Sequence, residues 1–174
     1  MLEFFKTEYD ISCSVPSDIN QHIPTLLQYS TMVNHVTEMG VRWGVSTRAF
    51  LYAAAKNKTK LRSYDIVLND TVIELFNKAK EANVDATYQQ ADTLNLTIEE
   101  TDLLFIDTDH TYNQLSQELK IHGNKARKYI IFHDTVTFPD LNRAIDEFLL
   151  VNSHWKVLHH YVNNNGLKIL ERNL

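Results

Sequence analysis

Apolar and polar residues follow two different periods along this chain, and stretches of the two periods alternate. Two runs, residues 103–106 and 129–132, are continuously apolar, which is typical of strands buried on both faces of a parallel sheet. Elsewhere apolar residues recur at helical spacing, and one such helix carries Val72, Leu75, Phe76, Ala79 and Ala82. The pattern predicts strands at residues 34–38, 61–65, 86–89, 103–107, 129–132, 155–160 and 167–170. It predicts helices at residues 24–32, 47–57, 70–82, 113–126 and 141–148.

The last two predicted strands differ from the others because no helix separates them. They are joined around Asn163-Asn164-Asn165-Gly166, a turn sequence that favours an antiparallel hairpin. We therefore predict an α/β fold with a doubly wound, mostly parallel, Rossmann-like sheet and an antiparallel C-terminal hairpin. Ligands of such folds bind beyond the carboxyl ends of the strands. Residues 1–22 show no clear period, and we expect them to pack on the domain surface or to form a flap near a ligand.

Length, charge and cysteine content narrow the class of protein. With 174 residues and 20.2 kDa, the chain fits one domain over residues 1–174, with an N-terminal segment at 1–22 and a core at 23–174. The formal charge of −5 gives no general attraction to phosphate backbones, so we expect no nucleic acid as the main partner. Cys13 is the single cysteine, and neither a signal peptide nor an apolar run of membrane-spanning length is visible. We therefore expect a cytoplasmic protein with no membrane partner.

A spaced pair of glycines stands where the first predicted strand gives way to a helix, in the sequence EMGVRWGVST. We predict a tight turn there, because Gly40 and Gly44 permit torsions and close approaches that a side chain forbids, and Ser46 or Thr47 can cap the helix. Dinucleotide-binding turns carry three glycines in the spacing G-x-G-x-x-G, and this stretch has two, four residues apart. The corner therefore indicates a ligand without a pyrophosphate, unless it is a purely structural turn.

The pattern E-x-G-x-x-x-G-x-S resembles motif I of class I S-adenosylmethionine (AdoMet) methyltransferases, in the variant of small-molecule O-methyltransferases. The resemblance covers about residues 23–170 and implies a seven-stranded sheet with one strand inserted antiparallel beside the last parallel one. It also implies that the acid and the glycine turn hold the methionine end of AdoMet. The residues at these positions are Glu38, Gly40, Gly44, Ser46 and Thr47.

Two further acids follow predicted strands. Asp65 lies 25 residues after Gly40, near the place where doubly wound folds put an acid that binds the ribose hydroxyls, although an acid after a strand is otherwise a solvated turn residue. Asp92 follows the third strand, where the resemblance implies an acid that accepts a hydrogen bond from the adenine amino group. The alternative for Asp92 is a helix N-cap or an Asx turn before Leu94.

The fourth and fifth strands end in the segments IDTDHTY and FHDT. Carboxylates crowded at one rim repel each other unless a cation or a shared proton relieves them, which favours a divalent cation. The two segments look like the signature of cation-dependent O-methyltransferases of the catechol and cephalosporin-tailoring types. That resemblance implies Mg²⁺ binding by Asp107, His133 and Asp134, with Asp107 also bordering the cofactor. It implies that His110 is the base that removes the substrate proton.

His133 departs from the pattern of that family, in which the pair closing the fifth strand commonly supplies two oxygen ligands. Imidazole is a better ligand for Mn²⁺, Fe²⁺ or Zn²⁺ than for Mg²⁺. Either the metal differs, or Asp107, Asp109 and Asp134 bind it while His133 hydrogen-bonds the substrate. A metal-free site with His110 or His133 as the sole base is a third alternative.

The sequence thus predicts an AdoMet-dependent O-methyltransferase that acts on a hydroxyl of a small molecule or sugar, with Mg²⁺ or Mn²⁺ as a second cofactor. The C-terminal hairpin and the N-terminal segment could serve as the surface of a homodimer. Two alternatives stay open. One is a non-catalytic nucleoside- or AdoMet-binding module on the same fold. The other is an NAD-dependent oxidoreductase, which the missing third glycine disfavours.

Overall fold

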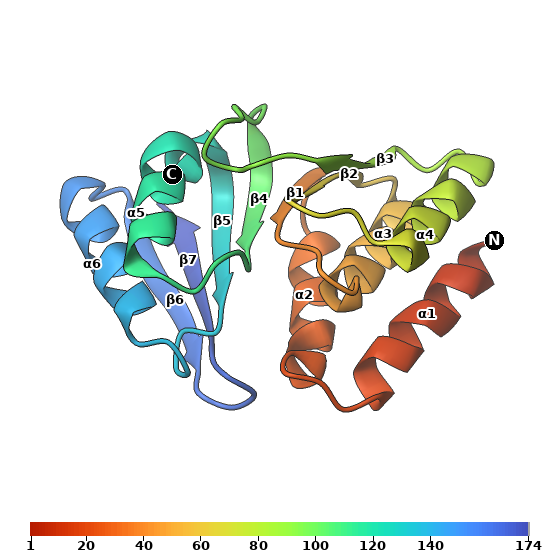
Figure 1. The fold of residues 1–174 in the computed structure, drawn as a ribbon, viewed down its shortest axis with the longest axis horizontal. Coiled ribbons are helices and arrows are strands. Elements are labelled where there is room, and N and C mark those ends of the chain that lie inside the picture. Colours follow the sequence, from red (N-terminus) through yellow and green to blue (C-terminus); the bar gives the residue numbers. More distant parts are fainter. Residues whose placement is uncertain (174) are drawn as a thin grey trace.

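The computed structural model describes residues 1–173. They contain a sheet of seven strands in the order β3-β2-β1-β4-β5-β7-β6 (Figure 1). Strands β1 to β5 are parallel, and β7 is antiparallel to both of its neighbours, β5 and β6. The predicted doubly wound sheet with an antiparallel C-terminal hairpin is confirmed. The strands are β1 (His35–Met39), β2 (Lys60–Asp65), β3 (Ala86–Gln90), β4 (Thr101–Ile106), β5 (Ala126–His133), β6 (Trp155–Tyr161) and β7 (Leu167–Arg172).

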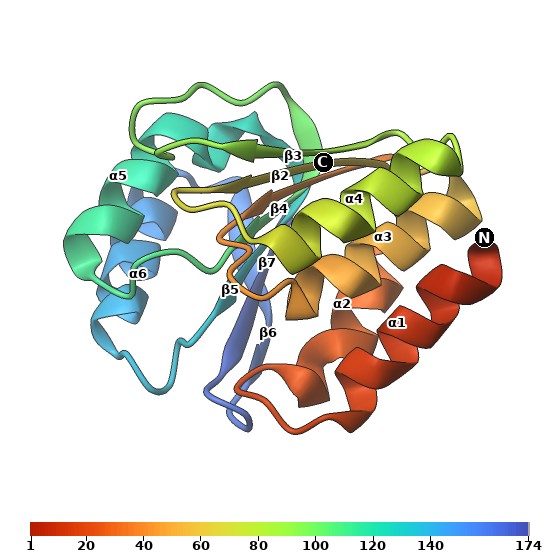
Figure 2. The same ribbon diagram turned by 45° about the vertical axis from the view of Figure 1, so that its right-hand side comes forward.

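Helices cover both faces of the sheet and form two outer layers (Figure 2). One layer contains α1 (Leu2–Ser14), α2 (Ile23–Ser30), α3 (Val45–Asn57) and α4 (Asp70–Glu81), and the other contains α5 (Tyr112–His122) and α6 (Asp140–Val151). Two short 3₁₀ turns, Asn20–His22 and Gly123–Lys125, precede α2 and follow α5. None of the helices within residues 1–173 combines the length and the apolar content that a membrane crossing requires.

Strand β4 shows why a continuously apolar run becomes a central strand. Leu103 and Phe105 contribute to the core between the sheet and the α1–α4 layer, while Leu104 and Ile106 contribute to the core between the sheet and α5 and α6. All four side chains are buried, because successive residues of a strand point to opposite faces and both faces are covered.

The N-terminal segment packs on the domain, as one of the two expectations had it, but with a regular helix that the sequence pattern does not predict. Most of it is the regular helix α1, which packs against α3 rather than lying as an irregular flap. At a spacing of four residues, Phe5 is buried in the core on this side and Tyr9 and Cys13 pack against it partly buried, with the centroid of the Tyr9 ring 5.4 Å from that of Tyr52 in α3. The polar residues between these positions weaken the apolar pattern, which is why the sequence shows no clear helical period.

Candidate active site

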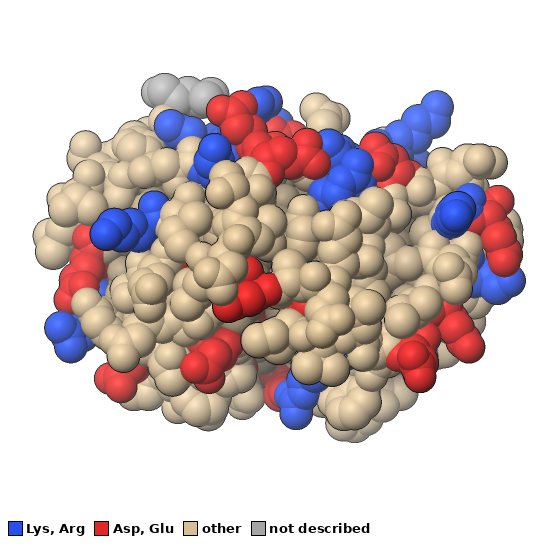
Figure 3. Space-filling view, turned by 45° about the horizontal axis from the view of Figure 1, so that its top comes forward, with Lys and Arg blue, Asp and Glu red and all other residues tan. Residues whose placement is uncertain are grey.

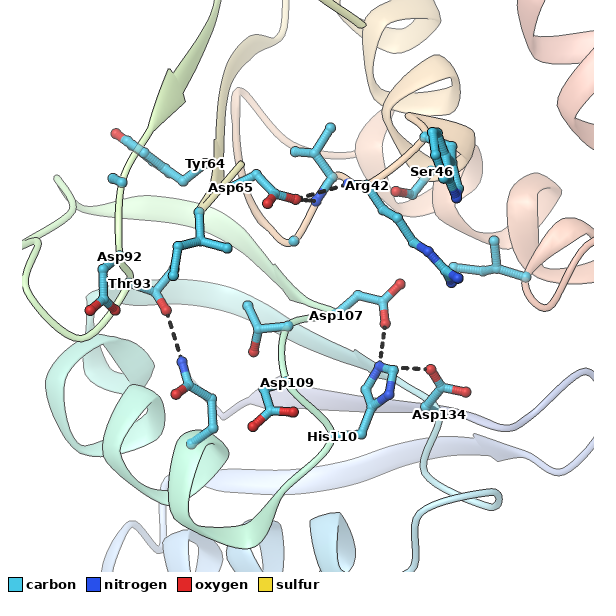
Figure 4. Close-up of a pocket in the computed structure, with 18 of the residues that line it drawn as sticks. Arg42, Ser46, Tyr64, Asp65, Asp92, Thr93, Asp107, Asp109, His110 and Asp134 are labelled. Carbon is cyan, nitrogen blue, oxygen red and sulfur yellow. Dashed lines mark hydrogen bonds and ion pairs between the residues drawn. The ribbon is translucent and has the colours of Figure 1, made fainter. Parts of the chain in front are cut away.

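A cavity of about 620 Å³ opens at the carboxyl edge of the sheet, among the loops that follow β1 to β5 (Figure 4). Such an edge is where ligands of doubly wound folds bind. Most residues that the sequence singles out line this cavity, namely Gly40, Ser46, Asp65, Asp92, Asp107, Asp109, His110 and Asp134. Four others lie outside its lining, namely Glu38, Gly44, Thr47 and His133.

The glycine corner follows β1 as predicted, and both glycines have positive φ. A Cβ on Gly40 would lie 1.9 Å from the backbone oxygen of Asp107, so the position accepts no side chain. Gly44 is the N-cap of α3 in a left-handed conformation, and no side chain caps this helix. The expectation that Ser46 or Thr47 is the cap is therefore wrong, because their hydroxyl groups bond elsewhere.

Those hydroxyl groups donate to Glu38, which is fully buried beneath the corner. Ser46 Oγ lies 2.7 Å and Thr47 Oγ1 3.0 Å from its carboxylate, and Ser63 Oγ of β2 lies 2.6 Å from it. Burial raises the pKa of Glu38 to about 7, against the opposite effect of these three hydrogen bonds. We therefore assign Glu38 and Thr47 a role in joining β1, β2 and α3, in place of the expected direct contact with a cofactor.

This raised pKa predicts a specific pH dependence of stability. The pKa of Glu38 in the folded state lies above the ordinary value of 4.5. Its contribution to the unfolding free energy is therefore greatest below pH 4.5 and is lost as the pH rises to about 7. The loss amounts to about 3 kcal/mol of unfolding free energy. Glu38→Gln should abolish this pH dependence. The difference in unfolding free energy between wild type and variant should therefore change by about 3 kcal/mol between pH 4.5 and pH 7. Urea unfolding at several pH values measures it, and parallel curves for the two proteins would contradict the assignment.

Asp65, at the end of β2, fastens the glycine corner from the other side. Its Oδ2 accepts hydrogen bonds from the backbone amides of Val41 (2.7 Å) and Arg42 (2.8 Å), and its Oδ1 accepts one from the amide of Val67 (3.0 Å). Arg42 has a φ of 49°, a conformation that costs a non-glycine residue energy and that these bonds help to hold. Since a carboxylate has about four acceptor positions, Asp65 can still accept a bond from a ligand in the cavity.

Asp92, after β3, both lines the cavity and forms a local turn. Its Oδ1 accepts a hydrogen bond from the amide of Leu94 at 2.9 Å, which is the Asx turn that the sequence offers as the alternative. Its Oδ2 accepts a bond from the side chain of Asn95 at 2.7 Å. The turn therefore orients the carboxylate, and the two roles do not exclude each other.

The loops after β4 and β5 bring Asp107, His110 and Asp134 into one cluster (Figure 4). Nε2 of His110 lies 2.9 Å from Oδ2 of Asp134 and 3.4 Å from Oδ1 of Asp107. Hydrogen bonds to Asp107 and then to Asp134 raise the pKa of His110 to about 9. Burial acts to raise the pKa values of both carboxyl groups, but their bonds to the histidines outweigh burial and hold these pKa values below the ordinary range.

His133 is buried behind this cluster. Its Nε2 donates to the backbone oxygens of Asp18 (3.0 Å) and Asn164 (3.2 Å), and its Nδ1 lies 3.3–3.4 Å from Asp134 and Asp107. Burial lowers the pKa of His133, but the two carboxylates outweigh burial and raise it to about 10. Because the side chain is 1% exposed and its Nε2 is occupied, only Nδ1 of His133 faces the cluster, and its expected catalytic and metal-binding roles stay predictions.

The donor set of the cluster suits a divalent cation. One ligand atom each from Asp107, His110 and Asp134 lies within 4.8 Å of the others. Oδ1 of Asp134 is buried and has no hydrogen-bond partner among the described residues, although buried polar atoms are nearly always paired. Asp134 also has a φ of 61°, a strained conformation that directs its carboxylate to this point.

A family model described as a methyltransferase domain matches residues 37–135, which is more than half of the chain. The chain belongs to this methyltransferase family. The match contains the glycine corner, Asp65, Asp92 and the cluster at Asp107, His110 and Asp134, so it covers the whole carboxyl edge of β1 to β5. The resemblance to methyltransferases that the sequence motifs suggest is thereby confirmed.

Solved structures of other methyltransferases share the fold. A Podospora anserina methyltransferase bound to S-adenosylhomocysteine (SAH) has a TM-score of 0.67 at 12% identity, with 98% of this chain and 88% of that chain covered. A Bacillus cereus O-methyltransferase in complex with SAH has a TM-score of 0.63 at 14% identity, covering 99% and 90%. The O-methyltransferase of Streptomyces achromogenes involved in tomaymycin synthesis, in complex with SAM, has a TM-score of 0.60 at 13% identity. The match covers 92% of this chain and 82% of that chain. The comparison with curated proteins gave no match.

The cavity of this methyltransferase also contains residues that sequence reasoning missed. Arg42 and Trp43 lie inside the glycine corner and line the cavity, and the exposed position of Trp43 gives it an apolar surface at the mouth. Asp18 comes from the segment between α1 and α2, and its carboxylate lies 3.2 Å from the guanidinium of Arg42. No sequence signal links Asp18 to the corner, because the contact depends on how the N-terminal segment packs. Gln114 of α5 also lines the cavity. The sequence does not single it out, because a polar residue of an amphipathic helix is expected on the solvent face.

Proposed function

We propose that this methyltransferase uses AdoMet as the methyl donor and methylates a hydroxyl group of a small molecule or sugar, with a divalent cation as a second cofactor. One observation carries the proposal. A single cavity is lined both by the glycine corner, Asp65 and Asp92 and by the cluster of Asp107, His110 and Asp134, with Asp92 at the end opposite Asp134 (Figure 4). A methyl donor and an acceptor that must meet in line require two such adjoining subsites.

The dimensions and charges of the cavity support ligands of this kind. Its volume of about 620 Å³ lies within the range of roughly 300–1,000 Å³ that small-molecule sites occupy. The similar structures from Podospora anserina, Bacillus cereus and Streptomyces achromogenes hold SAH or SAM, which supports AdoMet as the donor. On the face that Figure 3 shows, basic side chains are interspersed with acidic ones, which favours a small-molecule acceptor over a phosphate backbone.

In the proposed reaction, residues of the chain orient the acceptor and accept the proton of its hydroxyl group. His110 is 30% exposed at the cavity and lies against Phe138, with ring centroids 4.5 Å apart, so its imidazole is fixed in direction. We assign it the acceptance of the hydroxyl proton. We assign His133 the positioning of Asp107 and Asp134 from behind.

Asp107 and Asp134 are the residues that would hold the cation, and His110 beside them would stay free to act as the base. Bound there, a divalent cation would acidify the acceptor hydroxyl and would compete for the carboxylate oxygens that keep the proton on His110.

Asp65→Ala should weaken SAH binding by about 10- to 100-fold, because it removes charge-assisted hydrogen bonds to the ribose and the support of the glycine corner. Asp65→Asn separates these causes. Its amide oxygen can still accept from Val41 and Arg42, which share one oxygen of Asp65, while its NH₂ group can accept neither from a ribose hydroxyl nor from the amide of Val67. Calorimetric titration of both variants with SAH measures the effect, with Mn²⁺ binding unchanged. Wild-type affinity in both would remove Asp65 from the ribose role.

The proposed reaction is tested by incubating the protein with AdoMet labelled in its methyl group and a panel of catechols, flavonoids and sugars. Transfer to oxygen that Mg²⁺ or Mn²⁺ stimulates and a chelator suppresses is the expected result. Retained AdoMet binding with no transfer to any acceptor would favour the non-catalytic binding module instead.

A further inference from the structure

Three polar side chains form a row along the buried side of α5. Gln114, Glu118 and His122 are four residues apart, so they lie on one face of the helix. Glu118 and His122 are fully buried, and Gln114 reaches the cavity. A buried row of this kind is unusual, because polar side chains that leave water lose hydration and need compensating partners. We call Gln114, Glu118 and His122 the α5 polar row.

The carboxylate at the centre of the row joins three segments of the chain. Glu118 accepts hydrogen bonds from Oγ1 of Thr93 (2.6 Å), Nε2 of Gln114 (2.9 Å) and Oγ1 of Thr108 (2.8 Å). Thr93 follows β3, and Thr108 follows β4. All three donors line the cavity, whereas Glu118 itself lies behind them. The acid of the row therefore connects two cavity loops to a helix without entering the cavity.

Besides its bond to Glu118, Thr93 makes two further hydrogen bonds with side chains of α5. Nε2 of Gln114 donates to its hydroxyl at 3.1 Å (Figure 4), and Nε2 of His122 lies 2.7 Å from its backbone oxygen. A carbonyl oxygen only accepts, so Nε2 of His122 carries the proton. Burial lowers the pKa of His122, which favours the neutral ring. Both the side chain and the backbone of Thr93 are thus fixed by the α5 polar row.

The loop that contains Thr93 forms one end of the cavity. Ala91, Asp92, Thr93 and Leu94 all line it, and Asp92 and Thr93 lie across the cavity from Asp134 (Figure 4). Within the loop, Asp92 makes the Asx turn to Leu94, which orders the backbone only locally. The backbone amide of Ala91 donates to the backbone oxygen of Asp65 at the start of the loop, and the bonds from α5 tie Thr93 to the body of the domain.

We propose that Glu118, supported by His122, is a positioning residue that sets the loop at residues 91–94 to recognise the nucleobase of the bound cofactor. The proposal rests on the proposed AdoMet-dependent function, because it assigns the Asp92 end of the cavity to the adenine. A buried carboxylate with three donors from three segments fixes a geometry more narrowly than an apolar contact of similar size, since each hydrogen bond has a preferred direction. Loss of that geometry should weaken base selectivity more than it weakens binding as a whole.

Calorimetric titration with SAH and with S-inosylhomocysteine, which carries a carbonyl in place of the adenine amino group, tests this assignment. Wild type should prefer SAH by about tenfold or more. Glu118→Gln, which has nearly the same shape, and Thr93→Val, which removes the hydroxyl at the other end of the bond, should each bring the ratio close to 1. The double variant should add little to either single variant, because the two changes break one connection. Gln117→Ala, an exposed neighbour on α5, should keep the wild-type ratio.

The outcomes separate the two claims. If wild type binds no SAH, the proposed function fails and the positioning role fails with it. If wild type binds SAH but binds S-inosylhomocysteine equally well, the loop does not recognise the base. If the variants lose stability and affinity for both ligands in the same proportion, Glu118 is merely structural, and the positioning role is overturned. Urea unfolding of each variant shows that the proteins compared are folded.

Discussion

His110→Ala should lower the rate of methyl transfer by about 10²- to 10⁴-fold while leaving the affinity for SAH unchanged. The imidazole is the basic group at the rim of the cluster that is exposed to the cavity, with 30% of its side chain accessible, and His133 behind it is 1% accessible. The variant therefore loses the group that we assign to the hydroxyl proton, and no buried histidine can take its place. Steady-state kinetics with saturating AdoMet, together with calorimetry for SAH, separate turnover from cofactor binding.

His159→Ala is the matched control for this experiment. His159 is an exposed histidine of β6 that lies outside the lining of the cavity, so its loss should change neither turnover nor binding. A His110→Ala protein as active as wild type would remove His110 from the role of base. A variant that loses SAH affinity in parallel with turnover would show that His110 supports the cofactor instead.

Gly40→Ala should cost about 3 kcal/mol or more of unfolding free energy and abolish SAH binding. The added methyl group would lie 1.9 Å from the backbone oxygen of Asp107, and φ at this position is +86°. Relief of that overlap requires the β1 corner and the β4 loop to separate, and these are the two segments that bring the cofactor end and the reacting end of the cavity together. Chemical unfolding and SAH titration measure the two effects.

Gly123→Ala provides the comparison, because it is also crowded but lies after α5, outside the lining of the cavity. Its Cβ would meet the side chain of Phe148 at 2.6 Å, and a side chain can move where a backbone cannot. This variant should lose some stability and keep SAH binding. A Gly40→Ala protein as stable as wild type would contradict the tight contact between the two loops.

The sequence predicts the sheet well because central strands of the sheet are continuous runs of apolar residues. Residues 103–106 and 129–132 are buried on both faces, and a run of that kind has one stable place in a parallel sheet. The neighbourhood of Asp65, Asp107 and Asp134 follows from the same rule, since the carboxyl ends of parallel strands meet at one edge. The rule brings residues to the edge, but it does not say which way their side chains point.

Where the structure departs from the expected site, the departures concern such directions. Glu38 lies one residue before the end of β1, and its side chain points into the interior instead of the cavity, where Ser46, Thr47 and Ser63 surround it. Nε2 of His133 points to the backbone of Asp18, while its Nδ1 faces Asp107 and Asp134. That contact joins positions 115 residues apart, and only the packing of the N-terminal segment against the hairpin brings them together. Glu118 was overlooked for a similar reason, because a glutamate in an amphipathic helix is usually a solvated residue.

The most direct test of the account is a calorimetric comparison of SAH, AdoMet, NAD and NADP on the wild-type protein. The account predicts saturable binding of SAH and AdoMet, which Asp65→Ala weakens, and no binding of NAD or NADP. Binding of NAD or NADP without binding of SAH would contradict it, because the cavity beside the glycine corner would then hold a dinucleotide instead of a methyl donor.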